Sequence, residues 1–200
     1  MNFLAHIYLS GDNELLTIGN FSADGVRGNK YKEFPKSIQA GIILHRHIDT
    51  FTDAHPITKQ STKRLHKNYS HYSGVIVDIF YDHFLAKNWE DYSDINLSVY
   101  ISNFYKSLTD NFLVLPERFK KLTPVMIEGN WLLSYASIDG IERVLNGMNK
   151  RTKGRSKMNE AIHELVVYYD DFEKEFTQFF KELIVFSNQK RIEIEKEFNL

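Results

Sequence analysis

Two carboxylates interrupt an otherwise apolar stretch near the middle of the chain. Residues 75–86 carry apolar side chains on nearly every face of a helix, which is the pattern of a helix buried on all sides. Asp78 and Asp82 are four residues apart, so they share one face of this helix. Two like charges side by side in a buried position are costly unless a metal ion, an arginine or a shared proton lies between them.

A second polar pair has the same spacing in another predicted helix. His45 and Asp49 are four residues apart, and Gly41 one turn earlier would let a ligand or another backbone come close. Imidazole and carboxylate groups at this spacing are typical of metal ligands that project into a helical bundle. Two such pairs on facing helices predict one shared metal site.

The residue types restrict the metal and its chemistry. The chain contains no cysteine, so any metal must be held by nitrogen and oxygen atoms. Several carboxylates with one or two imidazoles suit Mn²⁺, Mg²⁺ or Fe²⁺, which activate water and clamp phosphoryl oxygens. Arg27 and Arg46 each lie close in sequence to a candidate ligand, and a guanidinium binds phosphate through two parallel hydrogen bonds. These features favour a metal-dependent phosphohydrolase.

Each of these features also has a purely structural interpretation. An i, i+4 polar pair is often a salt-linked surface pair, and Asp78 with Asp82 would be stable if an arginine closed the pair off. Asp24 and Arg27 lie within one turn of each other and would form a local ion pair. His6 lies in an apolar opening segment, where a single histidine is usually a hydrogen-bonded core residue.

Helical periodicity extends over nearly the whole chain, and strand-like alternation never persists. Asp12 or Asn13 is a suitable N-cap, and Pro35 and Pro56 suit the first turns of two helices, the second of which is basic. Pro124 is expected to begin another helix. Further helices are expected at residues 72–88, 95–115, 138–149 and 157–186. The connections are short, so we predict one all-α domain, a helical bundle over residues 1–200 with a polar tail at 187–200.

Composition excludes several classes of function. With 200 residues and a net charge of −1, the chain offers no global electrostatic case for binding nucleic acid or a membrane. The opening residues lack the basic region and the apolar run of a signal peptide. No stretch reaches the roughly 18 apolar residues of a membrane span. We therefore expect a cytoplasmic protein.

Five motifs occur in an order that resembles a known family. They are residues 2–6 (NFLAH), 23–29 (ADGVRGN), 45–49 (HRHID) with Thr52 and Asp53, 82–86 (DHFLA) and 144–148 (VLNGM). Together they span about residues 1–180 and resemble the acyl carrier protein phosphodiesterase family. The resemblance implies an all-helical fold distantly related to the HD-type metal phosphohydrolases, with Mn²⁺ as the usual metal. It also implies hydrolysis of the phosphodiester between 4′-phosphopantetheine and a serine of holo acyl carrier protein, which leaves the apo carrier protein and free 4′-phosphopantetheine.

The resemblance also implies where the site residues lie. The acidic and histidine positions of the family fall here on His6, Asp24, His45, Asp49, Asp78, Asp82 and His83. Among these, the predicted metal ligands are Asp24, His45, Asp78 and Asp82. The predicted catalytic residues are His6, Asp49 and His83. The residues predicted to bind the substrate phosphate are Arg27 and Arg46. The polar tail lies outside the resemblance.

One further segment bears on the partner. Residues 150–157 carry five positive charges and no acid, on Lys150, Arg151, Lys153, Arg155 and Lys157. Acyl carrier proteins are strongly acidic, so this segment would steer their docking, whereas the structural alternative is a solvated loop. Two other functions stay open: a phosphohydrolase of a small nucleotide or phosphate ester, with Tyr81 or Trp131 lining its pocket, and a non-catalytic module that binds a carrier protein.

Overall fold

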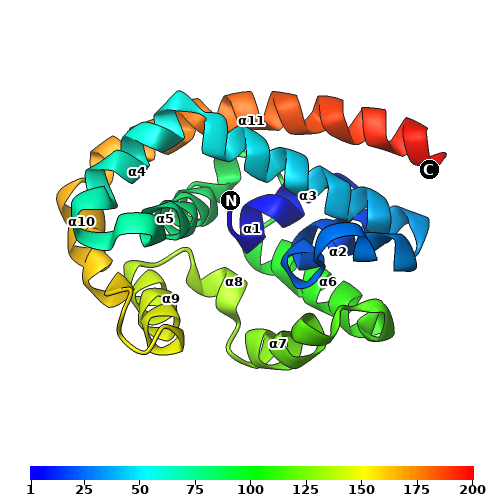
Figure 1. Ribbon diagram of the computed structural model, residues 1–200, viewed down its shortest axis with the longest axis horizontal. Coiled ribbons are helices and arrows are strands. Elements are labelled where there is room, and N and C mark those ends of the chain that lie inside the picture. Colours follow the sequence, from blue (N-terminus) through cyan, green and yellow to red (C-terminus); the bar gives the residue numbers. More distant parts are fainter.

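The chain forms eleven α-helices and no strand, and the computed structural model describes all of residues 1–200 (Figure 1). The all-α, single-domain fold expected from the sequence is confirmed. The helices are α1 (Phe3–Tyr8), α2 (Glu14–Ser22), α3 (Lys36–Ala54), α4 (Pro56–Tyr69), α5 (Ser73–Lys87), α6 (Leu97–Asp110), α7 (Glu117–Glu128), α8 (Trp131–Ser134), α9 (Ile138–Arg151), α10 (Ile162–Val167) and α11 (Tyr169–Phe198).

Local sequence signals explain several helix starts. The side chain of Asn13 accepts a hydrogen bond from the amide of Leu16 in the first turn of α2. Pro35 directly precedes α3, and Pro56 is the first residue of α4, where its missing N–H leaves no hydrogen bond unmade. These three starts confirm the sequence predictions.

Two glycines let α2 and α3 pack backbone against backbone. A Cβ atom at Gly19 would lie 2.3 Å from the carbonyl oxygen of Ile38, and one at Gly41 would lie 2.0 Å from that of Leu16. No side chain fits at these distances, so the two helices approach more closely than side chains normally allow. The prediction that Gly41 admits another backbone is confirmed. The contact fixes α2 against α3 one turn before His45.

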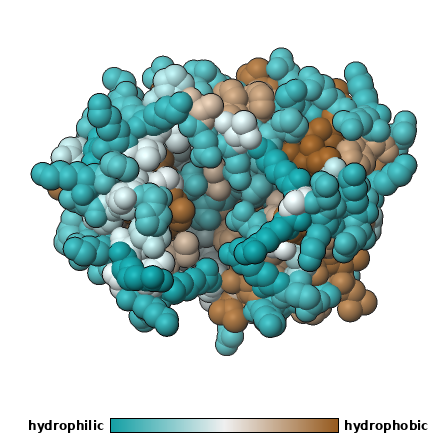
Figure 2. All heavy atoms as spheres, viewed as in Figure 1, coloured by the Kyte–Doolittle hydropathy of each residue, from teal (hydrophilic) through white to brown (hydrophobic).

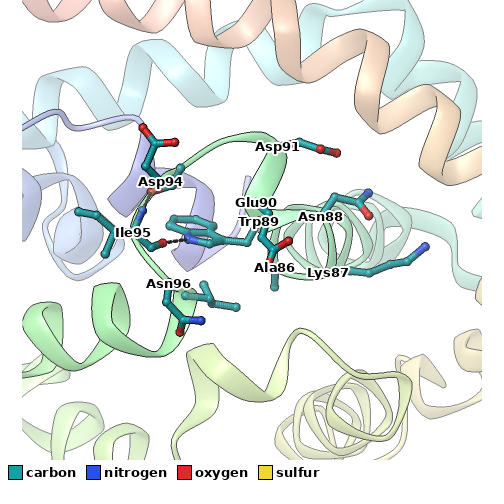
Figure 3. Close-up of a pocket in the computed structure, with 11 residues that line it drawn as sticks. Ala86, Lys87, Asn88, Trp89, Glu90, Asp91, Asp94, Ile95 and Asn96 are labelled. Carbon is teal, nitrogen blue, oxygen red and sulfur yellow. Dashed lines mark hydrogen bonds between the residues drawn. The ribbon is translucent and has the colours of Figure 1, made fainter.

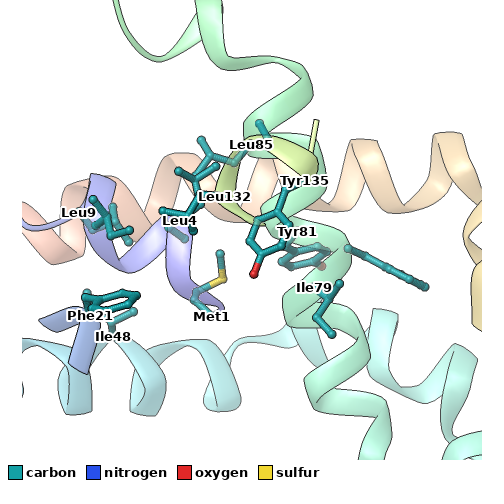
Figure 4. Packing of buried hydrophobic residues seen from close by; sticks show 14 of the residues in the cluster. Met1, Leu4, Leu9, Phe21, Ile48, Ile79, Tyr81, Leu85, Leu132 and Tyr135 are labelled. Atoms are coloured by element: carbon teal, nitrogen blue, oxygen red, sulfur yellow. The ribbon is translucent and has the colours of Figure 1, made fainter. Parts of the chain in front are cut away.

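The predicted buried helix is α5, which packs against α1, α4, α9 and α11. Its apolar side chains other than Val75 are buried, and burial contributes about 1.5–3 kcal/mol for each large one. Figure 4 shows Tyr81 and Leu85 of α5 in one cluster with Leu4 of α1 and Leu132 of α8. Neighbours on several sides therefore fix the orientation of α5, and with it the directions in which its two carboxylates point.

The prediction for Pro124 is wrong. Pro124 lies inside α7, which begins directly after Pro116. The helix continues through Pro124 because Phe119 before it and Met126 after it are both fully buried, so tertiary packing outweighs the lost backbone hydrogen bond.

The C-terminal region also differs from its predicted boundaries. Residues 158–167 form a short 3-10 segment and α10, whereas α11 begins only at Tyr169 and runs to Phe198. The polar segment 187–200 is thus mainly helical. Ion pairs at helical spacing join Lys190 to Glu193 and Arg191 to Glu195, and Ile194 is buried. Together these contacts keep a polar stretch in a helix.

The outward faces of the helices are mainly polar. Figure 2 shows a largely hydrophilic surface on which hydrophobic atoms gather in separate patches. None of the helices combines the length and the apolar composition that crossing a membrane requires.

Candidate metal centre

Two imidazole rings from different helices lie face to face at the centre of the molecule. His6 comes from α1 and His45 from α3, and they are only 1% and 7% exposed. Their ring centroids are 3.9 Å apart with an interplanar angle of 17°. Two stacked imidazoles cannot both carry a charge at this distance without strong repulsion, so at least one of the two rings is neutral.

A single residue of α2 orients both rings. Nδ1 of His6 donates to the side-chain oxygen of Asn20 at 2.8 Å, and Nδ1 of His45 donates to the main-chain oxygen of the same residue at 2.8 Å. The Asn20 amide is itself fixed, because its Nδ2 donates to the main-chain oxygen of His6 and to the hydroxyl of Ser10. Since these oxygens only accept, both rings carry their proton on Nδ1 and turn Nε2 toward the same space.

The carboxylate of Asp49 closes that space. One of its oxygens lies 3.2 Å from Nε2 of His6, and the other lies 3.0 Å from Nε2 of His45. Asp24, from the 3-10 segment Ala23–Gly25, places an oxygen 3.5 Å from the same His45 atom. The i, i+4 pair on α3 and the aspartate that follows α2 are therefore brought together with His6.

Asp78 of α5 approaches the same carboxylate from the other side. The amino group of Met1 lies 3.3 Å from Asp78 and 3.4 Å from Asp49, so one cation bridges the two aspartates. The amino group is fully buried, and the two carboxylates raise its pKa to about 10 against the opposing effect of burial. Of the predicted ligands, Asp24, His45 and Asp78 all border the space around Asp49.

The two histidines have opposite electrostatic environments. Burial and the neighbouring His45 lower the pKa of His6 to about 4, so this ring is neutral. Burial also disfavours charge on His45, but Asp24 and Asp49 outweigh it and raise the pKa of His45 to about 9. The hydrogen bond from protonated His45 and the charge of the Met1 amino group hold the pKa of Asp49 far below the usual range, against the effect of its own burial. The positive charge of protonated His45 therefore offsets part of the negative charge of Asp24 and Asp49.

This donor set fits a metal ion. His6, His45 and Asp49 each offer one ligand atom, and these atoms lie within 4.8 Å of one another. Nε2 of His6 is buried without any hydrogen-bond partner, although a buried polar atom normally has one. Its lone pair faces a carboxylate, an arrangement that a cation between them would make favourable. The three residues form a candidate metal site of nitrogen and oxygen atoms.

Asp82 does not face this cluster. Its two oxygens accept hydrogen bonds from the main-chain amides of Leu4 at 2.7 Å and Ala5 at 3.1 Å, and its side chain is fully buried. These amides belong to the first turn of α1, whose N–H groups have no partner inside the helix. Burial raises the pKa of Asp82 to about 7, although the two amides favour its charged form. Asp82 therefore holds the first turn of α1, and His6 follows Leu4 and Ala5 directly in that helix.

His83 is also turned away from the cluster. Nδ1 lies 2.7 Å from the main-chain oxygen of Tyr135, and Nε2 lies 2.8 Å from the hydroxyl of Tyr169 on α11. Both ring nitrogens of His83 therefore have a hydrogen-bond partner. His83 points in a different direction from Asp82 because successive side chains leave a helix about 100° apart. The structure therefore does not bring His83 to the other predicted catalytic residues.

The two predicted phosphate-binding arginines, Arg27 and Arg46, are both exposed. The guanidinium of Arg46 donates to the main-chain oxygen of Gly28 at 2.7 Å and lies over the ring of Tyr31. Arg27 directly precedes the 3-10 segment Gly28–Glu33, and its side chain is exposed and makes no hydrogen bond or ion pair. Neither arginine closes off the carboxylates, so the structural alternative of an arginine-neutralised pair does not apply.

The predicted docking segment 150–157 forms the end of α9 and the turn that follows it. The turn is built on positive φ angles at Lys153, Gly154 and Lys157 and on hydrogen bonds among Asn149, Thr152 and Ser156. In Figure 1, α9 lies at the lower left, well apart from α2 and α3. This segment therefore does not line the candidate metal centre.

A separate hollow of about 620 Å³ lies over the loop that follows α5 (Figure 3). Its walls come from residues 86–97, and the indole of Trp89 donates to the main-chain oxygen of Ile95 across its base. None of the predicted site residues lines it. Glu90, Asp91 and Asp94 give it an acidic rim that would repel a phosphate.

Two components of the site are absent from the sequence prediction. Asn20 orients both imidazoles, and Gly19 beside it permits the close helix contact. A signal for Asn20 exists, because it is the one amide side chain in an apolar segment between Leu15 and Phe21. A buried amide in such a segment requires polar partners, but the sequence does not reveal that these are histidines.

Known proteins resemble this chain over most of its length. The family model of acyl carrier protein phosphodiesterase matches residues 1–183. The acyl carrier protein phosphodiesterase of Photorhabdus laumondii subsp. laumondii is 33% identical over 181 residues, which cover 90% of this chain and 91% of the relative. The proteins of the same name from Yersinia enterocolitica and Escherichia coli are each 31% identical over 193 residues, which cover 96% of this chain and 100% of the relative. No solved structure matches the chain significantly. The order of the five motifs and these relatives agree: the chain belongs to the acyl carrier protein phosphodiesterase family.

Proposed function

We propose that this protein is a phosphoric diester hydrolase that removes 4′-phosphopantetheine from holo acyl carrier protein. The family to which it belongs carries this substrate and this bond type in its description. The observation that carries the proposal is the convergence of His6, His45 and Asp49 from two helices on one buried polar space. The Nε2 atom of His6 is buried without a hydrogen bond and lies 3.2 Å from an oxygen of Asp49, which suits two ligands of one cation.

Three residues would hold the metal, and two more aspartates border it. His6, His45 and Asp49 offer the ligand atoms, while Asp24 and Asp78 approach from opposite sides. A divalent cation, when bound, supplies positive charge for the phosphoryl oxygens and lowers the pKa of a water molecule. Asn20 keeps both rings in the orientation and tautomer that ligands need. We propose Mn²⁺ as this metal, with Mg²⁺ or Fe²⁺ as alternatives.

The bond changes define the roles of the remaining residues. Water adds to phosphorus, the bond from phosphorus to the serine oxygen breaks, and the serine oxygen leaves with a proton. Arg27 and Arg46, both exposed, are proposed to bind the non-bridging phosphate oxygens, whose charge the transition state redistributes. In place of the metal-ligand role predicted from the sequence, we propose for Asp82 a positioning role, in which its oxygens hold the turn of α1 that carries His6.

The nucleotide alternative lacks a structural feature that it needs. The groove next to Asp78 is lined by no Phe, Tyr or Trp on which a base would stack, and His66 is its one aromatic ring. Tyr81 is fully buried and hydrogen-bonded to Ser61. A carrier-protein substrate needs no aromatic side chain on which a base would stack. We propose that hydrolysis of this substrate takes place in the cytoplasm, as the sequence predicts.

One assay tests the proposal. The purified protein is freed of metal with a chelator and then given Mn²⁺, Mg²⁺ or Fe²⁺ together with holo acyl carrier protein. The expected result is conversion to the apo form, with equimolar 4′-phosphopantetheine, only after a metal is restored; mass spectrometry of the carrier protein measures it. A holo carrier protein that stays intact with every metal would reject the proposed activity. Conversion at full rate in the presence of chelator would reject its metal dependence.

A further inference from the structure

A polar groove of about 400 Å³ lies between α4 and α5, and its lining includes Asp78, which borders the candidate metal centre. Its walls are formed by Asp53, Thr58, Lys59, Thr62, Lys63, His66, Gly74 and Asp78. The inner end is acidic, because Asp53 and Asp78 lie there. The α4 wall carries two positive charges, because Lys59 and Lys63 lie at i and i+4 on one face of α4, and His66 follows on the same face.

The two sides of α4 have different roles. Gln60, Ser61 and Arg64 all bind Glu175 on α11, which attaches this side of the helix to the core. Lys59, Lys63 and His66 on the other side are exposed, and their side chains make no hydrogen bond or ion pair. Lys59 and Lys63 are therefore cations with no internal partner on the groove side of α4.

The segment between Asp53 and Asp78, which includes all of α4, contains no acidic residue. Residues 54–77 include Lys59, Lys63, Arg64 and Lys67 but not one Asp or Glu, although the whole chain carries 26 acids against 25 bases. Only Arg64 of these four has an acidic partner in the fold. A chain of nearly zero net charge thus concentrates unpaired positive charge on one helix face, and that face suits an anionic partner.

The groove adjoins the proposed site through Asp78. Asp78 lines the inner end, and it also faces the Met1 amino group, 3.3 Å away, which lies 3.4 Å from Asp49 of the candidate metal centre. A partner seated on α4 therefore has the reacting centre at the end of its own binding surface. The 150–157 segment, by contrast, does not line this groove.

We infer that the groove side of α4 is the docking surface for an acidic protein face, with Lys59 and Lys63 as its main contacts. On the proposed function that protein is the carrier protein, and docking on α4 places its phosphodiester at the Asp78 end of the groove. Lys59 and Lys63 attract the carboxylates of the partner during encounter and pair with them in the complex. Thr58 and Thr62, which line the same wall, add no charge. The 150–157 segment then adds long-range attraction from another side of the molecule.

The test compares two charge reversals of equal size. The groove variant is Lys59→Glu with Lys63→Glu. The matched control is Lys174→Glu with Lys181→Glu, two exposed lysines on α11 that lie among Asp170, Glu173 and Glu182. For holo carrier protein at low ionic strength, the groove variant is expected to raise KM about tenfold or more and to leave kcat much less affected. The difference from wild type should shrink near 1 M salt, where the screening length is about 3 Å. The control should keep a wild-type KM.

A binding measurement separates this inference from the proposed function. Calorimetric titration with apo carrier protein requires no turnover, and wild type should bind it more tightly than the groove variant at low salt. If wild type binds the carrier protein without hydrolysing it, the proposed function fails while docking on α4 stands. If the groove variant and the control bind the carrier protein equally well, docking on α4 is refuted whatever the activity. The milder pair Lys59→Gln with Lys63→Gln, expected to lie between wild type and the reversal, excludes an effect of misfolding.

Discussion

At the scale of single residues, the site depends on how buried charges are balanced. His6 and His45 point their Nε2 atoms at one carboxylate, and only His45 gains a proton in the absence of metal. That proton stabilises the metal-free fold below about pH 6.5, and its contribution is lost as the pH rises through about 9. A bound metal would replace the proton, because a ligand nitrogen must be unprotonated.

Metal binding at pH 7 should therefore release about one proton per protein molecule, since the pKa of His45 is about 9 before binding. Titration of Mn²⁺ in buffers of different ionisation enthalpy measures the release. The release should vanish as the pH is raised above about 9. His45→Gln should bind metal weakly and release no proton; full proton release from this variant would assign the proton to another group.

Asp49 and Asp82 should respond differently to substitution. Asp49→Asn removes the carboxylate that both imidazoles share, so Mn²⁺ should no longer raise the melting temperature. In wild type, metal at 100 times its Kd should add about 2.7 kcal/mol. Asp82→Asn leaves at least one buried amide of α1 unsatisfied, which costs about 1–3 kcal/mol, but the variant should still be stabilised by Mn²⁺.

Thermal melts of the three proteins with and without Mn²⁺ decide between the roles. If Asp82→Asn loses the metal-dependent shift while keeping wild-type stability without metal, Asp82 is a ligand, as the sequence predicted, and not the anchor of α1.

At the scale of elements, the site depends on the contact between α2 and α3. Gly19 and Gly41 bring the two backbones together, and this contact places the main-chain oxygen of Asn20 against Nδ1 of His45. α5 then supplies Asp82 to hold α1, which carries His6. Each imidazole is thus oriented by a helix other than its own.

Gly41→Ala should lower both stability and activity. The added Cβ would lie 2.0 Å from the carbonyl oxygen of Leu16 and 2.6 Å from the amide nitrogen of Asn20, so α2 must move away. Overpacking of this kind costs about 1–3 kcal/mol, and the displaced Asn20 would release His45. The control is Gly147→Ala in α9, where nothing lies within 4 Å and alanine should gain about 0.5–1 kcal/mol. Chemical denaturation and carrier-protein hydrolysis measure the two effects; equal behaviour of both variants would contradict the packing argument.

At the scale of the whole molecule, function depends on where charge lies and not on its total. Although the net charge is −1, the protein has two basic surfaces, the groove side of α4 and the turn at 150–157. Only the first adjoins the candidate metal centre. The second can act on a charged partner at a distance, and such an effect is confined to about 8 Å at physiological ionic strength.

Replacing Lys153, Arg155 and Lys157 by serine should lower kcat/KM for holo carrier protein at low salt and have little effect at high salt, because distant charges act mainly on the association rate. Hydrolysis of a small phosphodiester should not change, since none of the three residues lies in the site. Steady-state kinetics on both substrates at two salt concentrations measure this. Equal losses on both substrates would instead assign the turn a role in maintaining the fold.

The sequence by itself determined the fold class, the family and much of the site composition. Helical periodicity, caps and prolines predicted the all-α fold because these signals act over a few residues. The i, i+4 spacing put His45 and Asp49 on one face, since helix geometry fixes such neighbours without any tertiary contact. The apolar surroundings of Asp78 and Asp82 predicted a buried helix, which α5 confirms.

Only the tertiary structure decided which of these residues share a space and what each one faces. Asp82 and His83 turn to the amides of α1 and to Tyr135, because the rotation of α5 is set by packing against several helices at once. Asn20 meets both histidines because two glycines remove the side chains between α2 and α3. Contacts between residues far apart in sequence depend on the sum of many packing energies, and no local pattern encodes that sum.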